Sequence, residues 1–402
     1  MQNEQSFHNR FIQNKDGVIG PVEPKLKTLV RKAIGDYPGI PRAYLDVAEV
    51  YASKKLRGPG ICDELMELIQ HMFTEEEAMV CRHLKPGVMD LTASTIADRE
   101  HRPVDEIREI LERLSKEKRI IMGMGPKDRR IYFTIPIVPG AFETVLAHTS
   151  MEHLTSWHHR FAELFEKLFD TGFTAGRGEA PAEKSVIRYL PVGHLIKTNQ
   201  VALPADKLEE MYEPFGKSLG VTLCQCRITM DIMGQNCGRP MEVCTVMGPM
   251  AEGSIKDGRA RRVELKELID IKIEAEASGL VTWTMNVDPT KSSSTSCSCC
   301  GCCCHYMRGV SEFSMPAAIY PPKFLPVYHS NKCSNCGKCA LACPMGAITV
   351  NVKAKTFQHN KERCIGCGQC VVACSKENAL GMDAVPNYKE PVSMGFGGIG
   401  EL

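Results

Sequence analysis

The residues of this chain that can do chemistry are its cysteines, and their placement matters more than their number. Two of the 20 cysteines, Cys62 and Cys81, stand alone in the first half. The other eighteen form three groups, Cys224–Cys244, Cys297–Cys304 and Cys333–Cys374. The N-terminus lacks the apolar stretch of a secretory signal, so we expect a cytoplasmic protein in which clustered cysteines are metal ligands rather than disulfides. So many thiols also indicate a reducing, anaerobic cell.

The last group repeats one motif. Its first copy is Cys333-x2-Cys336-x2-Cys339-x3-Cys343-Pro344, and its second is Cys364-x2-Cys367-x2-Cys370-x3-Cys374. In such runs three cysteines bind one [4Fe–4S] cluster, and the fourth binds the other cluster. We therefore predict one cluster on Cys333, Cys336, Cys339 and Cys374, and a second on Cys364, Cys367, Cys370 and Cys343. A zinc ribbon or a disulfide knot is the alternative, but this doubled spacing is not that of zinc sites.

With these motifs, residues 325–386 resemble the bacterial two-cluster ferredoxins. The resemblance implies electron transfer to a redox partner, either a flavoprotein or another oxidoreductase subunit. We expect Gly337, Gly366 and Gly368 to let backbone amides approach the cluster sulfides. The second copy has Ser375 where the first has Pro344, which removes no ligand.

The first group can form a third metal centre. Cys224 and Cys226 are followed by Arg227, and the group ends with Cys237 and Cys244. Two thiolates in Cys-x-Cys face one metal only on a bent loop. A further [4Fe–4S] cluster, structural zinc and free thiols all remain open.

The middle group is unusually dense. Neighbouring side chains point in different directions, so its thiols cannot all bind one ion. They can divide between two sites, one of them shared with Cys224–Cys244, or hold a cluster of unusual nuclearity. The remaining alternative is a redox-sensitive tract without metal, and His305 is either a ligand or a bystander. The members of this group are Cys297, Cys299, Cys300, Cys302, Cys303 and Cys304.

The order of these motifs over residues 70–380 resembles an anaerobe family of 4Fe–4S dicluster proteins. These proteins join a helical N-terminal part, a Cys-x-Cys-Arg segment, a Cys-Cys-Gly-Cys-Cys-Cys tract and a terminal ferredoxin module. The resemblance implies redox work with flavin- or metal-containing partners and names no substrate.

The N-terminal elements resemble a winged helix. Thr74–Glu77 has capping-box spacing, and helices are predicted there, over Thr95–Arg99 and from Pro103. Two apolar runs, 120–124 and 131–135, follow as a hairpin. The third helix carries Asp105, Glu106, Glu109 and Glu112, which oppose contact with phosphates, and Lys127, Arg129 and Arg130 are too few to compensate. We therefore expect no nucleic-acid partner.

The middle section mixes helices and strands. Helices are predicted over 152–170, 204–218 and 262–278, and strands over 186–192 and 280–286. Residues 288–296 read as a polar linker, and the Gly-rich tail 393–402 as mobile.

These elements predict an α+β multidomain chain. Its parts are a helical extension (1–60), a winged-helix-like domain (61–148), a mixed α/β domain (149–290), a Cys-rich tract and linker (291–324), a two-cluster ferredoxin domain (325–386) and a tail (387–402). The 49 basic and 48 acidic residues argue against a general polyanion binder. No run of 18 apolar residues predicts a membrane span.

The leading functional hypothesis is an electron-transfer subunit of an oxidoreductase. An enzyme with its own substrate site at the middle cysteines is an alternative, although no dinucleotide-binding or P-loop motif accompanies it. Gly172–Gly178 is Gly-rich but lacks the flanking strand and helix. A redox-sensing winged-helix regulator is the third hypothesis.

Overall fold

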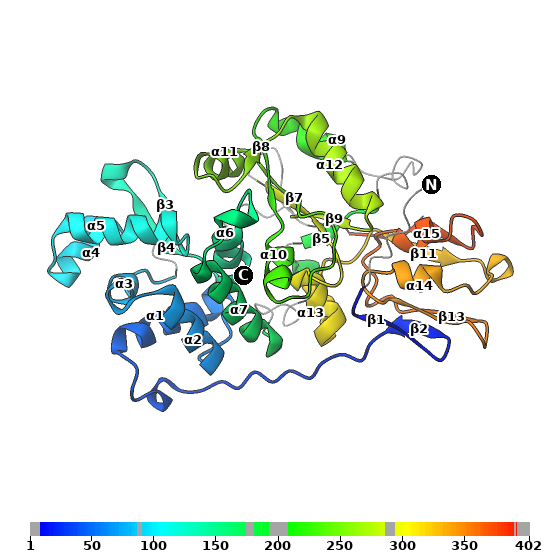
Figure 1. Ribbon diagram of the computed structural model, residues 1–402, viewed down its shortest axis with the longest axis horizontal. Helices are drawn as coiled ribbons and strands as arrows, with labels where there is room; N and C mark the ends of the chain where they lie inside the picture. The colour runs from blue at the N-terminus through cyan, green and yellow to red at the C-terminus, as the bar shows by residue number, and fades with distance from the viewer. Residues whose placement is uncertain are drawn as a thin grey trace. The chain divides into compact units, whose positions relative to one another are not determined.

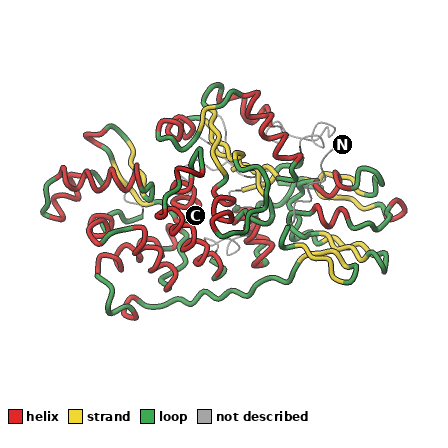
Figure 2. Tube along the Cα trace, in the orientation of Figure 1, coloured by secondary structure: helices red, strands yellow, loops and turns green. Residues whose placement is uncertain are grey.

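The computed structural model describes residues 9–86, 91–173, 181–185, 187–192, 208–285, 294–389 and 391. The chain forms two compact units (Figures 1 and 2). Of the described residues, the helical unit contains 27–173, and the cysteine unit contains 9–26 and those from 181 onward. None of the described helices is long and apolar enough to cross a membrane.

The helical unit is mostly α-helical, with a core rich in aromatic residues such as Phe142, Phe161 and Phe165. Its helices are α1 (Arg42–Ala52), α2 (Asp63–Met72), α3 (Glu75–Cys81), α4 (Ala93–Glu100), α5 (Val104–Glu112), α6 (Phe142–Leu146) and α7 (Ser156–Asp170). The predicted capping box opens α3: Thr74 Oγ1 accepts from the Glu77 amide at 3.2 Å, and the Glu77 carboxylate accepts from the Thr74 amide at 2.8 Å.

A hairpin follows α5. Strands β3 (Ile121–Met124) and β4 (Ile131–Thr134) pair antiparallel, and Thr92 adds an isolated bridge to Ile131. The predicted order of helices and hairpin is therefore present. Asp105, Glu106 and Glu109 of α5 are exposed, so this helix presents an acidic face.

The cysteine unit is built on a six-stranded sheet with the order β5-β9-β10-β7-β6-β8. The strands are β5 (Ile187–Tyr189), β6 (Leu219–Leu223), β7 (Glu242–Met247), β8 (Arg261–Arg262), β9 (Val281–Met285) and β10 (Ser294–Cys299). Its helices are α9 (Leu208–Tyr212), α10 (Gln225–Ile232), α11 (Pro249–Lys256), α12 (Leu265–Ala277) and α13 (His305–Phe313). Leu268 of α12 packs against Leu219 and Val221 on one face of the sheet. Met307 and Val310 of α13 share a core with Trp283 on the other face.

The structure of this unit differs from the sequence prediction at several elements. The expected linker 288–296 is wrong from residue 294 onward, because Ser294–Cys299 is the strand β10 between β9 and β7. The helix predicted over 204–218 is α-helical only at Leu208–Tyr212 within the described residues, since Pro214 opens a 3₁₀ turn at Glu213–Phe215. Residues 204–207, 286–293 and 393–402 lie outside the described part of the chain.

The C-terminal part repeats one small unit twice. Strand β11 (Phe324–Tyr328) pairs with β14 (Leu380–Ala384), and β12 (Ile348–Asn351) pairs with β13 (Thr356–His359). Helices α14 (Lys338–Ala342) and α15 (Gln369–Ala373) each begin inside a cysteine run.

The expected helical extension 1–60 is wrong at its start. Strands β1 (Ile12–Lys15) and β2 (Val18–Pro21) form a hairpin, and Ile19 of β2 pairs with Val350 of β12. The turn Asp16-Gly17 has two positive φ angles (55° and 88°), which suit a tight hairpin. The N-terminal hairpin thus extends the sheet of the C-terminal module.

Candidate metal centres

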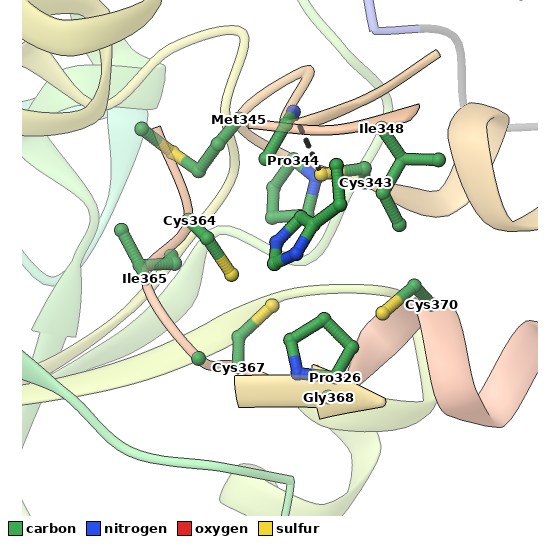
Figure 3. A pocket seen from close by; sticks show the side chains of 13 residues that line it. Pro326, Cys343, Pro344, Met345, Ile348, Cys364, Ile365, Cys367, Gly368 and Cys370 are labelled. Carbon is green, nitrogen blue, oxygen red and sulfur yellow. Dashed lines mark hydrogen bonds between the residues drawn. The ribbon is translucent and has the colours of Figure 1, made fainter. Parts of the chain in front are cut away.

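The cysteine runs of the C-terminal module line two cavities. One cavity, of about 320 Å³, is lined by Cys343, Cys364, Cys367 and Cys370, and their sulfurs point into it (Figure 3). The other, of about 300 Å³, is lined by Cys333, Cys336, Cys339 and Cys374. Each cavity takes three cysteines from one run and the fourth from the other, which is the grouping that the spacing predicts.

The two cavities differ in exposure. Cys336 is exposed, and Cys333 and Cys374 are partly exposed, so their cavity is the outer one. Cys343, Cys367 and Cys370 are buried, so their cavity is the inner one. The outer cavity also includes Lys338 and Glu377, whereas the inner one adds the His359 ring to apolar side chains such as Met345 and Ile365.

The loops are shaped to turn amides toward sulfur. Gly337 and Gly368 precede α14 and α15 with φ of 76° and 79°, a conformation that side chains disfavour. The Asn335 amide donates to Cys333 Sγ at 3.3 Å, and the Ala347 amide donates to Cys343 Sγ at 3.2 Å. Such N–H···S bonds stabilise sulfur that carries negative charge.

The thiols fit a positively charged iron core. Burial raises the pKa of Cys339 and of Cys364 to about 12, so the bare thiolates are disfavoured there. Four iron ions in a cluster core supply the charge that makes thiolate ligation favourable. The donor set and the lining therefore fit [4Fe–4S] clusters.

Four of the upstream cysteines form a compact group. The sulfurs of Cys237, Cys300, Cys302 and Cys303 all lie within 4.8 Å of one another. The Cys237–Cys300 separation is 3.9 Å and the Cys302–Cys303 separation is 3.7 Å. Four thiolates at about 2.3 Å from one tetrahedral ion lie roughly 3.8 Å apart. This tetrathiolate site (Cys237, Cys300, Cys302, Cys303) thus fits a single ion, zinc or iron.

Basic side chains accompany these thiols. Arg227 donates to Cys300 Sγ at 3.7 Å, and Arg239 donates to Cys302 Sγ at 3.5 Å. The pKa of Cys300 lies well below its usual range, because the thiols of Cys237, Cys302 and Cys303 hydrogen-bond to it. A thiolate, the form that binds metal, is therefore favoured at this position.

The other six upstream cysteines lie around this site and are called the six-thiol ring; four of them, Cys224, Cys226, Cys244 and Cys297, pack in the same core as the tetrathiolate cysteines. The pKa of each thiol is shifted by the two thiols on either side of it in the order Cys224, Cys226, Cys304, Cys299, Cys297, Cys244 and back to Cys224. The pKa of Cys297 falls to about 5, because the thiols of Cys244 and Cys299 hydrogen-bond to it. Cys237 thus belongs to the tetrathiolate site, although Cys224, Cys226 and Cys244 are nearer to it in sequence.

Four further side chains belong to this region. His305 Nδ1 lies 3.3 Å from Cys226 Sγ, and the Tyr189 hydroxyl lies 3.7 Å from Cys304 Sγ. Arg227 and Lys272 are buried beside the thiols. Sequence reasoning noted His305 and quoted Arg227 within its motif, but it missed Tyr189 and Lys272. Nothing in the sequence marks these two, because they come from β5 and α12, far from the cysteines along the chain.

The middle cysteines adjoin the inner cavity. A Cβ atom at Gly301 would lie 1.8 Å from the carbonyl oxygen of Pro344, so the Cys300–Cys304 loop presses on the residue after Cys343. Cys299 and Cys304 share one hydrophobic core with Cys343 and Cys367. The two cysteine regions are therefore contiguous.

Comparison with known proteins supports the C-terminal assignment. Residues 332–386 match the family model described as a 4Fe-4S dicluster domain. No curated protein and no solved structure matches the chain. The match implies [4Fe–4S] clusters and iron–sulfur electron transfer, and the cysteine-rich middle region is consistent with a further metal centre.

Proposed function

We propose that this chain is the electron-transfer component of an anaerobic oxidoreductase complex. The observation that carries the proposal is the pair of four-cysteine cavities, one near the surface and one beside the middle cysteines. The outer cluster is held by Cys333, Cys336, Cys339 and Cys374, and the inner cluster by Cys343, Cys364, Cys367 and Cys370. A [4Fe–4S] cluster gains and loses one electron at a time.

The arrangement supports a direction for the electrons. A partner exchanges electrons at the outer cluster, where Cys336 is exposed. The inner cluster then links the outer one to the middle centre, since Gly301 abuts Pro344. The chain's own residues exclude water from the inner cluster and fix the positions of its four cysteine ligands.

The surface beside the outer cluster suits a protein partner. Leu341 of α14 is 55% exposed, and Lys332 and Lys338 nearby are exposed. An apolar side chain with basic neighbours is typical of a weak redox-docking site. We propose a flavoprotein or another oxidoreductase subunit with an acidic docking surface as the partner.

Metal analysis tests the proposal directly. The chain is purified without oxygen, and iron, acid-labile sulfide and zinc are counted per chain. We expect at least about eight irons with as many sulfides, together with EPR signals from two interacting reduced clusters. Protein that stays colourless after anaerobic reconstitution with iron and sulfide would contradict the proposal.

A redox-sensing regulator is a second candidate, because the order of α3, α4, α5 and the β3–β4 hairpin supports a winged-helix-like domain. The acidic face of α5 opposes it, since acidic side chains repel DNA phosphates. We propose that this domain contacts protein instead. A gel shift with genomic fragments separates the two ideas, and specific retardation would favour the regulator.

A further inference from the structure

The six thiols of the ring come from two interior strands of the sheet, β7 and β10, and from the starts of two helices, α10 and α13. In the antiparallel register of β7 and β10, Thr245 lies opposite Ser296, so Cys244 comes opposite Cys297. Cys299, two residues further along β10, lies on the same face as Cys297. Cys224 and Cys304 are the N-caps of α10 and α13, and Cys226 lies in the first turn of α10.

This geometry does not suit a single metal ion. Among the described residues, only the tetrathiolate cysteines form a group of three or more ligand atoms within 4.8 Å of one another. Six thiolates also exceed the four ligands of a tetrahedral ion. A ring of six thiolates instead suits several metal ions, each bound by part of the ring.

The surroundings supply positive charge without a carboxylate to balance it. Arg227 is 1% exposed, no described carboxylate forms an ion pair with it, and its Nε has no hydrogen-bond partner. The guanidinium donates to the Ser298 carbonyl, between Cys297 and Cys299 of the ring, at 3.2 Å, and to Cys300 Sγ of the tetrathiolate site at 3.7 Å. Lys272 is fully buried, and its Nζ contacts the Val243 and Ser296 carbonyls and Ser298 Oγ.

Buried cations persist only beside compensating negative charge. The ring lies close to both cations, because Ser298, which contacts Lys272 and Arg227, stands between Cys297 and Cys299 in β10. The N-termini of α10 and α13 add positive potential at Cys224 and Cys304. Three independent features therefore point to an anionic group within the ring.

We propose that Cys224, Cys226, Cys244, Cys297, Cys299 and Cys304 hold a polynuclear iron–sulfur centre, separate from the single ion of the tetrathiolate site. Thiolates and sulfides of such a centre add negative charge beside Arg227 and Lys272, and each thiol releases its proton when it binds iron. This centre lies beyond the two ferredoxin-type clusters, which can be present whether or not the ring is loaded.

The test is a metal count on full-length variants purified without oxygen. Cys226→Ser combined with Cys297→Ser removes two thiols on opposite sides of the ring, and Cys62→Ser, a buried cysteine of the helical unit, is the matched control. We expect the double variant to lose at least about four irons and a similar number of sulfides while keeping the eight of the ferredoxin module. Unchanged iron and sulfide, or loss of one metal without sulfide, would overturn the proposal.

A non-ligand variant guards against simple misfolding. Arg227→Met removes the buried charge, and Arg227→Lys restores it. We expect Arg227→Met to lower the occupancy of the ring centre or to shift its midpoint potential downward, with partial recovery in Arg227→Lys. The EPR signals of the ferredoxin-type clusters stay unchanged and report that the chain is folded. If the unaltered chain, Arg227→Met and Arg227→Lys carried the same amount of iron in the six-thiol ring at the same midpoint potential, the proposed charge compensation by Arg227 would be contradicted. Failure of the electron-transfer proposal is a different result, the loss of the ferredoxin signals in the unaltered chain.

Discussion

The C-terminal module and the middle region both gather cysteines, but they do so in different ways. In the module, three ligands of each cavity come from one short cysteine run, and the fourth is the residue that ends the sister repeat's helix, Cys374 after α15 or Cys343 after α14. In the middle region, Cys237 joins thiols more than sixty residues later, and Cys244 meets Cys297 across two strands. The ligand sets of the module can be predicted from the spacing of its cysteines along the chain, whereas those of the middle region depend on strand register.

This difference affects what holds each site. A loop that carries three cysteines and a left-handed glycine is preorganised by its own backbone. The middle sites are assembled only when β7, β10, α10 and α13 pack together. The middle centres should therefore depend on the tertiary structure, and the tertiary structure on them.

The largest expected effect comes from removing a ligand of the outer cluster. Cys336→Ala should remove about four irons and abolish electron exchange with a partner, because three thiolates no longer complete the site. Iron counting and EPR measure the loss, and the signal of the inner cluster should persist without the coupling between clusters. Ser334→Ala, two residues away, is the control and should keep all its iron. Full iron content in Cys336→Ala would show that the outer cavity holds no cluster.

Removing two tetrathiolate ligands should affect stability more than redox content. Cys302→Ser with Cys303→Ser is expected to lose one metal ion and no sulfide, and to destabilise the cysteine unit by at least about 3 kcal/mol, since the free energy of structural metal binding is also folding free energy. Metal analysis and chemical denaturation measure both effects. Loss of sulfide together with the metal would show that the tetrathiolate cysteines and the six-thiol ring bind one common iron–sulfur centre.

The junction of the two regions can be tested at Gly301. Gly301→Ala places a Cβ 1.8 Å from the Pro344 carbonyl oxygen, so backbone must move, at a cost of about 3 kcal/mol or more. We expect slower electron transfer from the inner cluster to the middle centre, measured by reduction kinetics of each signal. The control is Gly253→Ala on α11, where nothing lies within 4 Å. Equal rates in both variants would show that the contact does not couple the regions.

Features that depend on interactions between residues close together in the chain can be predicted from the sequence. The capping box at Thr74 and the two cysteine runs are recognisable because their interactions join residues only three or four apart. The strand β10 is not recognisable, since Ser294–Cys299 carries the polar composition of a linker and pairs only because β9 and β7 lie on either side. The N-terminal hairpin has a local signal in Asp16-Gly17, a pair that favours tight hairpin turns, but its attachment to β12, more than 300 residues away, has none. The division of ten cysteines into four and six follows from that register and had to be observed.

The smallest expected effect lies at Gly337, where the loop geometry of the module can be separated from its packing. Gly337→Ala strains a residue with φ of 76° and brings a Cβ to 2.3 Å from Ile19 Cδ1 on the N-terminal hairpin. We expect a cost of about 1–2 kcal/mol from the backbone alone, with both clusters retained. Adding Ile19→Ala relieves the contact but not the φ strain, so the remaining cost measures the loop itself. Gly381→Ala, with nothing within 4 Å, is the control. If Gly337→Ala proved as stable as Gly381→Ala, the loop would not be preorganised by its glycine, and the contrast with the middle region would fail.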